Sequence, residues 1–211
     1  LGVSTLTVAM ALAARSGGSP SAAVDLAQCG GGLDLAAGAE TADGLRWSDL
    51  VNARGELGDV AGSLPSVAGV PLLALSREAP AGPSPDTVAA VLTALARAHE
   101  LVLADCGREP PPTSTDHTVL VVGADVRSVA AARMLAEVRS VRPTAIVVRR
   151  GPGRSLPEKV VARALGAPSL GQIGHHRPLP RLAELGLLPV AAPARGYVRE
   201  VGAILSGLTR A

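Results

Sequence analysis

The stretch that decides the fold is Leu1-Gly2-Val3-Ser4-Thr5-Leu6, which leads into the apolar residues of a helix predicted from Thr5 to about Arg15. A glycine followed by hydroxyl residues at the start of a helix leaves backbone N–H groups unpaired and turns the positive end of the helix dipole outward. These features suit a bound phosphate. A phosphate-binding loop of the G-x-x-x-x-G-K-[ST] type ends in this way, but Val3 occupies its lysine position here.

The composition predicts one globular α/β domain that covers residues 1–211. Apolar residues make up 47% of the chain and charged residues 18%, which excludes a disordered chain. Trp47 and Tyr197 are the only aromatic residues, so a base-stacking platform for single-stranded nucleic acid is not expected. Cys29 and Cys106 stand alone, without metal-type spacing, and indicate a reduced cytosolic protein with two buried thiols.

Apolar segments and helical patterns alternate along the chain. Strands are predicted at 22–26, 71–75, 101–105, 118–122, 144–148 and 169–173, with 101–105 as the clearest buried strand. Helices are predicted at 85–95, 126–139, 157–165, 179–185 and 195–208, and a helical turn at 33–37. This order predicts a doubly wound, mostly parallel sheet flanked by helices. Because no strand precedes Gly2, we expect the first strand to be missing and the domain to be truncated at its N-terminus.

Charge is divided unevenly between the two parts of the chain. Residues 1–125 carry 6 Arg against 14 Asp and Glu, a net charge of −8, whereas residues 126–211 carry 14 Arg and Lys against 4 Glu, a net charge of +10. The arginine-rich second half indicates a basic face for an acidic partner, a membrane surface or DNA, or else a solvated surface. The single lysine, Lys159, falls in a late helix, so no lysine is placed to serve a phosphate loop.

Three separated segments could form one site. Gly2–Thr5 would bind a nucleotide phosphate through backbone N–H groups, and Ser4 would hold Mg²⁺ through its hydroxyl. Asp25 closes the next strand and could orient a water or the metal, and Asp105 follows four apolar residues at the end of a later strand, where it could hold the outer shell of the metal. The carboxyl ends of strands are where ligands bind in a doubly wound sheet. An acid at a strand end can also simply cap a loop.

With these residues the chain resembles the MinD/ParA family of deviant Walker A ATPases, most closely its CpaE-like, septum-site-determining branch from actinobacteria. Residues 2–6 resemble the end of a G-G-x-G-[AV]-S-T-L loop, 24–35 resemble V-D-L-D-x-x-G-G-G-L-D-L, and 44–50 resemble G-L-R-W-x-D-L. Residues 116–132 and 165–168 also match the branch. The resemblance implies a P-loop NTPase fold, ATP and Mg²⁺ as ligands, homodimer formation, and protein partners in the division or the pilus and secretion machinery.

The departures from that family concern the nucleotide. Val3 stands at the lysine position, Ala27 replaces the second acid of the usual D-x-D, and Arg149-Arg150 stands where active relatives often have an adenine-recognising asparagine. Since phosphoryl transfer depends on electrostatic stabilisation, these changes imply a weak or inactive ATPase. The resulting hypothesis is a cytoplasmic regulatory protein, peripheral at the membrane in one version, that has a degenerate nucleotide site and acts through protein contacts in septum-site determination or in pilus or secretion assembly.

Two alternatives stay open. One is an active ATPase that dimerises on ATP and whose signature lysine lies upstream of Leu1. The other is a non-specific DNA-binding, partition-like protein that uses the arginine-rich second half.

Two further segments have alternative interpretations. His175-His176 is interpreted as a surface loop rather than a metal site, because adjacent side chains point in different directions. The helix at 195–208 places five apolar residues on one side, which would pack on the domain or lie on a membrane: Val198, Val201, Ile204, Leu205 and Leu208.

Overall fold

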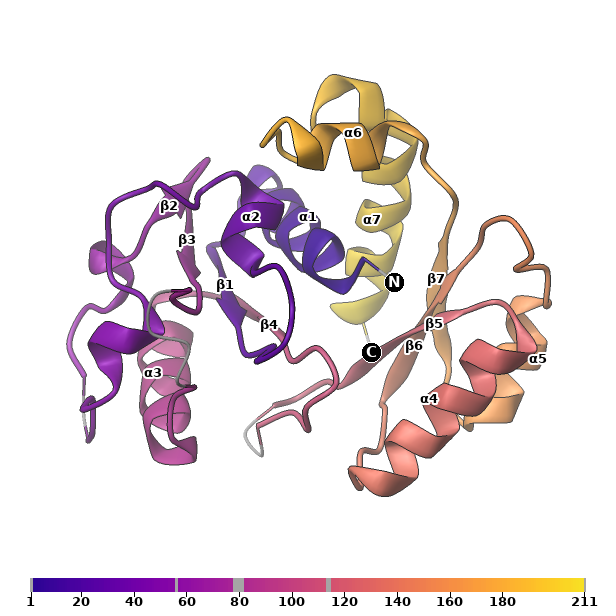
Figure 1. Ribbon diagram of the computed structural model, residues 1–211, viewed down its shortest axis with the longest axis horizontal. Coiled ribbons are helices and arrows are strands. Elements are labelled where there is room, and N and C mark those ends of the chain that lie inside the picture. Colours follow the sequence, from indigo (N-terminus) through magenta and orange to yellow (C-terminus); the bar gives the residue numbers. More distant parts are fainter. Residues whose placement is uncertain (1, 56, 78–81, 113–114, 211) are drawn as a thin grey trace.

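The computed structural model describes residues 2–55, 57–77, 82–112 and 115–210. Leu1, with which the decisive stretch begins, lies outside these ranges, as do parts of the loops around 79–85 and 108–115. Two groups of strands, covered by helices on both faces, make up the molecule (Figure 1). The expected α/β class with mostly parallel strands is therefore confirmed.

The first half contains a four-stranded sheet in the order β2-β3-β1-β4. β1 pairs in parallel with both β3 and β4, whereas β2 and β3 form a short antiparallel hairpin that the sequence did not predict. The elements are α1 Val3–Ser16, β1 Ser21–Asp25, α2 Leu33–Ala37, β2 Ser66–Val67, β3 Val70–Leu73, α3 Pro85–Ala98 and β4 Leu101–Asp105, with 3₁₀ turns at Trp47–Leu50 and Ala61–Ser63.

The second half contains a three-stranded parallel sheet in the order β5-β6-β7. Its strands alternate with helices as predicted, and the observed bounds lie within a residue or two of the expected ones. The elements are β5 Val119–Gly123, α4 Val126–Val138, β6 Ala145–Arg149, α5 Glu158–Leu165, β7 Ser169–Ile173, α6 Pro178–Glu184, a 3₁₀ turn at Ala192–Ala194, and α7 Arg195–Leu208.

Side chains that alternate along β6 show why helices cover both faces. Val147 packs in one cluster with residues of α1 and α7, whereas Ile146 and Val148 pack in another with α4 and α5. Successive side chains of a strand point to opposite faces, so a strand that is apolar throughout requires helices on both sides. In Figure 1, α1, α6 and α7 accordingly lie on one side of the strands and α3, α4 and α5 on the other.

One feature of the sheet differs from the prediction. Among the described strands, β4 and β5 do not pair with each other, so two sheets are present instead of one. The expectation that 101–105 is the clearest buried strand was wrong: Leu101–Ala104 are only partly buried, whereas all five residues of β1 are buried. The reason is that β4 has a strand neighbour at one edge alone. Among the described strands, β4 and β5 each lie at the edge of their sheet.

α7 packs on the domain, which is one of the two expected alternatives. Tyr197, Val201, Ile204 and Leu208 are buried and contact the cluster around α1 and β7. The apolar side that a membrane would need is therefore covered by protein. None of the helices within the described ranges has the length and apolar character needed to cross a bilayer.

The two thiols differ in exposure. Cys29 is exposed in the glycine loop after β1, so the prediction that both thiols are buried was wrong for this residue. Cys106 is partly buried directly after β4, and burial together with the nearby charges of Asp105 and Asp25 raises its pKa to about 11.

Candidate functional site

The start of α1 forms the centre of the candidate site. Gly2 adopts a left-handed conformation, with φ 77° and ψ 37°, which glycine tolerates without strain. The first helical hydrogen bond runs from the Leu6 N–H to the Gly2 carbonyl, 3.1 Å. The N–H groups of the three residues between them therefore have no helical partner, as the sequence predicted for this stretch.

Ser4 and Asp105, which are 101 residues apart, meet at this helix start. The Ser4 hydroxyl donates to Asp105 Oδ2 at 2.6 Å, and the Gly107 N–H donates to Asp105 Oδ1 at 2.9 Å. Asp105 is buried, and a hydroxyl–carboxylate bond of this length is charge-assisted. The two predicted magnesium ligands are thus adjacent, and each currently serves as the other's hydrogen-bond partner.

Asp25 lies beside Asp105, because the two acids are register partners at the carboxyl ends of β1 and β4. Both of its carboxylate oxygens are held by the loop that follows: Oδ1 accepts the Ala27 N–H at 3.0 Å and Oδ2 accepts the Leu33 N–H at 2.8 Å. Burial raises the pKa of Asp25, and these two backbone N–H groups partly oppose the rise. In this geometry Asp25 caps the glycine loop, and Ala27 contributes a backbone donor instead of a second acid.

An ion pair fixes the rest of the glycine loop. Arg77 donates to both oxygens of the buried Asp34, at 2.7 and 2.9 Å, and also to the Gly31 carbonyl at 3.0 Å. This hydrogen bond to Asp34 is the main cause that raises the pKa of Arg77. Sequence reasoning missed Arg77, since it lies 43 residues from Asp34 in a segment without a motif.

The Gly44–Leu50 motif supports the same end of β1. The Trp47 indole N–H donates to the Asp25 carbonyl oxygen at 2.6 Å, and the indole is completely buried. Arg46 holds the preceding turn by donating to the carbonyls of Ala39, Ala42 and Gly44. The Gly44–Leu50 motif, which the sequence shares with the resembled family, therefore holds the end of β1 that carries Asp25 in place.

Arg149, at the carboxyl end of β6, reaches the start of α1 from the other sheet. Its Nη2 lies 3.9 Å from the position that a Cβ on Gly2 would occupy. His176, nearby, pairs with Glu200 at 2.7 Å and meets Tyr197 edge to face, with 5.5 Å between ring centroids. Within the described residues no three His, Cys, Asp or Glu side chains are grouped to hold a metal, so Ser4 and Asp105 stay the candidate ligands.

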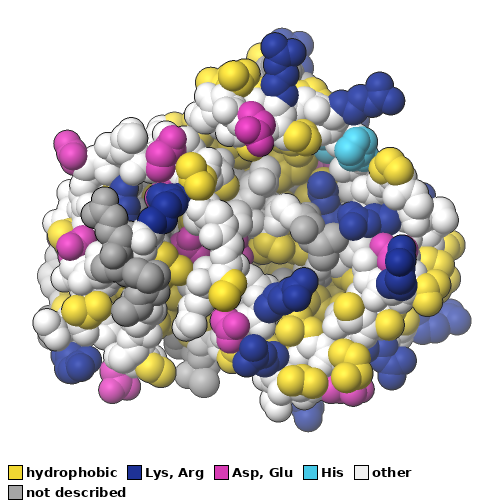
Figure 2. Space-filling view, in the orientation of Figure 1, with side chains coloured by type: hydrophobic (Ala, Val, Ile, Leu, Met, Phe, Trp, Pro, Cys, Tyr) yellow, Lys and Arg dark blue, Asp and Glu magenta, His cyan; other side chains and the backbone are white. Residues whose placement is uncertain are grey.

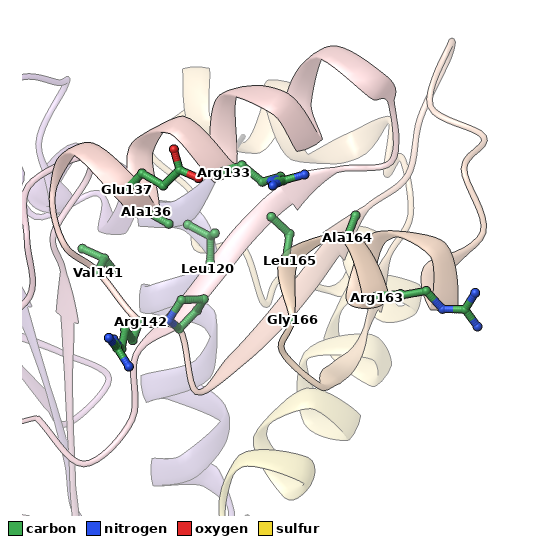
Figure 3. A pocket seen from close by; sticks show the side chains of 11 residues that line it. Leu120, Arg133, Ala136, Glu137, Val141, Arg142, Arg163, Ala164, Leu165 and Gly166 are labelled. Atoms are coloured by element: carbon green, nitrogen blue, oxygen red, sulfur yellow. The ribbon is translucent and has the colours of Figure 1, made fainter.

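A separate open groove of about 510 Å³ lies between α4 and α5 (Figure 3). Arg133 and Glu137 project from α4, and Arg163 projects from α5 on the other side. Its lining is Leu120, Arg133, Ala136, Glu137, Val141, Arg142, Pro143, Arg163, Ala164, Leu165 and Gly166.

The outer side of α4 beside this groove is apolar. Of the residues of α4, all of which the structure describes, Ala132 alone is buried. Val126, Ala130, Met134 and Val138 follow one another at four-residue spacing and are exposed, the two valines at 71% each and Met134 at 59%. Figure 2 shows hydrophobic and basic side chains interspersed over α4 and α5. We call these four residues, with Arg133, Arg142 and Arg163, the α4–α5 face.

Comparison with known sequences gives one informative match. No family model matches the chain. A protein described as uncharacterized in two strains of Mycobacterium tuberculosis is 37% identical over 196 residues, which cover 87% of this chain and 53% of that protein. The chain thus spans about half the length of the curated relatives it matches.

Solved structures with the same fold are ATPases of the MinD and ParA type. A chain of the MinC:MinD cell division protein complex from Aquifex aeolicus superposes with a TM-score of 0.78 at 19% identity, covering 99% of this chain and 90% of that chain. A ParA family ATPase from Chlorobium tepidum gives 0.78 at 15% identity, with 97% and 93% covered. MinD from Pyrococcus horikoshii in complex with Mg-ADP gives 0.71 at 15% identity, with 98% and 90% covered. The chain therefore has the MinD/ParA P-loop NTPase fold.

Proposed function

We propose that this chain is a cytoplasmic regulatory domain of the CpaE-like and MinD-like type, with a degenerate nucleotide site, that acts through protein contacts in septum-site determination or in pilus or secretion assembly. The observation that carries the proposal is the site at the start of α1. There, Val3 occupies the lysine position, and the Ser4 hydroxyl donates a hydrogen bond to the Asp105 carboxylate. The remaining acid, Asp25, is committed to capping the glycine loop.

The missing lysine is the strongest reason to expect little ATP turnover. Catalysis in P-loop enzymes is mainly electrostatic, and removal of a single stabilising group costs about 10²–10⁵ in rate. Lys159, the single lysine of the chain, lies in α5 and does not line the site. Weak nucleotide binding without rapid hydrolysis is therefore the expected behaviour.

The residues present fit ATP and Mg²⁺ only in part. The free N–H groups at the start of α1 suit phosphate oxygens, and the Ser4 hydroxyl and Asp105 carboxylate are oxygen ligands of the kind that Mg²⁺ prefers. A bound Mg²⁺ would neutralise charge on the phosphate. The chain supplies no lysine beside it, so we expect both ATP and Mg²⁺ to be held weakly.

The α4–α5 face supports the proposed protein contacts. Its arginines, Arg133, Arg142 and Arg163, take part in none of the ion pairs found within the described residues, and Glu137 is the single acid that lines the groove. A solvated surface or a DNA-binding surface has no need for the exposed apolar stripe of α4. Exposed apolar side chains bordered by unpaired arginines match a partner segment that carries apolar residues flanked by carboxylates.

Restoring the lysine tests the proposal. We expect the protein to bind Mg-ATP weakly and to hydrolyse it at a negligible rate, and Val3→Lys to raise its affinity for ATP about tenfold or more through a new charge-assisted contact. Val3→Met, of similar length but uncharged, is the matched control. Isothermal titration calorimetry and phosphate release would be measured in the longest polypeptide that carries this chain. Rapid hydrolysis by the wild type, unchanged by Val3→Lys, would contradict the proposal.

An active ATPase that dimerises on ATP is the second candidate, favoured by the intact Ser4–Asp105 pair. It predicts a dimer by size-exclusion chromatography when ATP is present and a monomer after Asp105→Ala. The DNA-binding alternative has less support, because the two arginines proposed to contact DNA phosphates, Arg149 and Arg150, are both partly buried. Arg150 also donates a hydrogen bond to the Leu156 carbonyl.

A further inference from the structure

We propose that the groove between α4 and α5 binds an acidic amphipathic helix of a partner protein. The inference rests on the proposed function, which requires protein contacts, and it names the surface and the chemistry of the partner. Arg142 and Gly166 line the groove just before β6 and β7 begin, so the groove lies at the amino ends of these strands. Arg149, which reaches the start of α1, lies at the carboxyl end of β6. The groove is therefore separate from the candidate nucleotide site.

α4 is apolar on two sides. Its inner side packs on the core, where Ala132 and Val129 contact the cluster beneath the helix. On its outer side Val126, Met134 and Val138 are exposed at 71%, 59% and 71%. A helix on the surface of a globular domain usually carries polar residues on the side away from the core. A row of exposed apolar side chains is instead typical of a surface that another molecule covers.

The groove continues this apolar surface toward α5. Its floor contains Leu120 and Leu165, which are partly buried, pack on the same core cluster and lie between the two helices in Figure 3. On α5, Val160 is 50% exposed and lies one turn before Ala164, which lines the groove. Two helical walls with an apolar floor suit the ridge of side chains of a third helix.

The length of the exposed row indicates how much of a partner helix it would cover. Val126 and Val138 are separated by twelve helical positions, which correspond to about 18 Å along the axis. A partner segment of about three turns would therefore cover the whole row.

The charges around the groove determine the chemistry of the partner. Arg133, Arg142 and Arg163 are exposed, and none of them belongs to an ion pair recorded for the described part of the chain. Glu137 is the single acid among the lining residues. A helix that carries Asp or Glu beside its apolar residues would pair with these arginines, whereas a basic helix would be repelled by them.

The same features disfavour other occupants. A symmetric contact with a second copy would place the arginines of one face against those of the other. Helices that lie on membranes carry Trp, Phe or Leu on their apolar side, but the exposed row of α4 consists of Val, Ala and Met. Trp47 and Tyr197, the two aromatic residues of the chain, are both buried elsewhere.

A library of random peptides displayed on phage tests the chemistry without assuming it. The library would be selected on the longest polypeptide that carries this chain. We expect the enriched peptides to have apolar residues at helical spacing, flanked by Asp or Glu. The peptide with the highest affinity would then be synthesised, together with a counterpart that has Lys in place of each acid, and both would be titrated by fluorescence anisotropy.

Four variants locate the binding surface. Met134→Glu and Arg163→Glu should each weaken binding of the acidic peptide about tenfold or more. Leu185→Glu and Arg199→Glu are the matched controls and should bind like the wild type: Leu185 is 60% exposed after α6, and Arg199 is exposed on α7. The double variant Arg133→Glu/Arg163→Glu should bind the lysine counterpart more tightly than the acidic peptide. Because all these side chains are exposed, melting temperatures should stay close to that of the wild type.

Several outcomes would overturn the inference. They are a failure to enrich any peptide, enrichment of basic peptides, and an equal loss of affinity in Met134→Glu and Leu185→Glu. Self-association, or binding to phosphatidylserine–phosphatidylcholine vesicles or duplex DNA, that Met134→Glu abolishes would assign the surface to that occupant instead. Hydrolysis of Mg-ATP by the wild type would refute the proposed degenerate nucleotide site and leave peptide binding unaffected, so the two failures are distinguishable.

Discussion

The hydrogen bond between Ser4 and Asp105 allows the sharpest prediction, because one substitution removes it and little else. Ser4→Ala deletes the donor that lies 2.6 Å from Asp105 Oδ2. Hydrogen bonds to charged groups contribute about 1.5–3 kcal/mol to stability, and alanine regains about 0.5 kcal/mol through its higher helix propensity. We therefore expect Ser4→Ala to lower the free energy of unfolding by about 1–2.5 kcal/mol.

Urea denaturation measures this loss directly. Unfolding would be followed by circular dichroism and by the fluorescence of Trp47, which is the single tryptophan of the chain and completely buried. With a urea m-value of about 2–3 kcal/mol/M, the midpoint should fall by about 0.3–1.2 M at unchanged m. Ser206→Ala is the matched control, since Ser206 is exposed on α7 and the change in propensity is the same.

Two results would refute the reasoning. If Ser4→Ala and Ser206→Ala had the same urea midpoint, the hydrogen bond between Ser4 and Asp105 would contribute nothing to the free energy of unfolding. If millimolar Mg²⁺ raised the midpoint of the wild type but not of Ser4→Ala, the pair would serve mainly as a metal site and not as a structural contact.

Three other predictions concern the residues around this site. Trp47→Phe should cost about 2–4 kcal/mol, because it leaves a buried carbonyl without a donor and creates a small cavity; a loss below about 1 kcal/mol by circular dichroism would contradict this. Cys29 should react rapidly with a thiol reagent and Cys106 slowly. Since the pKa of Cys106 rises from 9.0 to about 11 on folding, the free energy of unfolding should fall as the pH rises from about 9 to 11. A Cys106→Ala variant should not show this part of the fall. Gly32→Ala should cost about 1–3 kcal/mol in urea denaturation, because φ is 101° and the new Cβ would lie 2.5 Å from a carboxylate oxygen, whereas Gly30→Ala, with open space around it, should cost less than about 1 kcal/mol.

Much of the fold followed from local sequence patterns. The helix predicted at 195–208 is observed as Arg195–Leu208, and the strand at 169–173 as Ser169–Ile173. The hydroxyl residues after Gly2 marked the start of a helix, and acids at strand ends marked Asp25 and Asp105 as neighbours. These patterns are reliable because helical and strand periodicity and helix starts are determined by residues close together in the chain.

The error about β4 has a different origin. The run 101–105 is as apolar as a central strand, but its burial depends on which strands lie beside it. The apolar character of a segment favours its burial, but it does not determine which strands or helices pack beside it. The open edges of β4 and β5 could therefore be recognised only in the sheet topology.

By itself, then, the sequence determined most of the strands and helices, and a helix start at Gly2 that suits an anion but lacks a lysine. Only the tertiary structure decided which distant groups meet there: Ser4 with Asp105, and Arg149 with Gly2. The physical reason is that periodicity and helix starts depend on neighbours in the chain, whereas a contact across 101 residues depends on strand register and on the packing of α1 against two sheets.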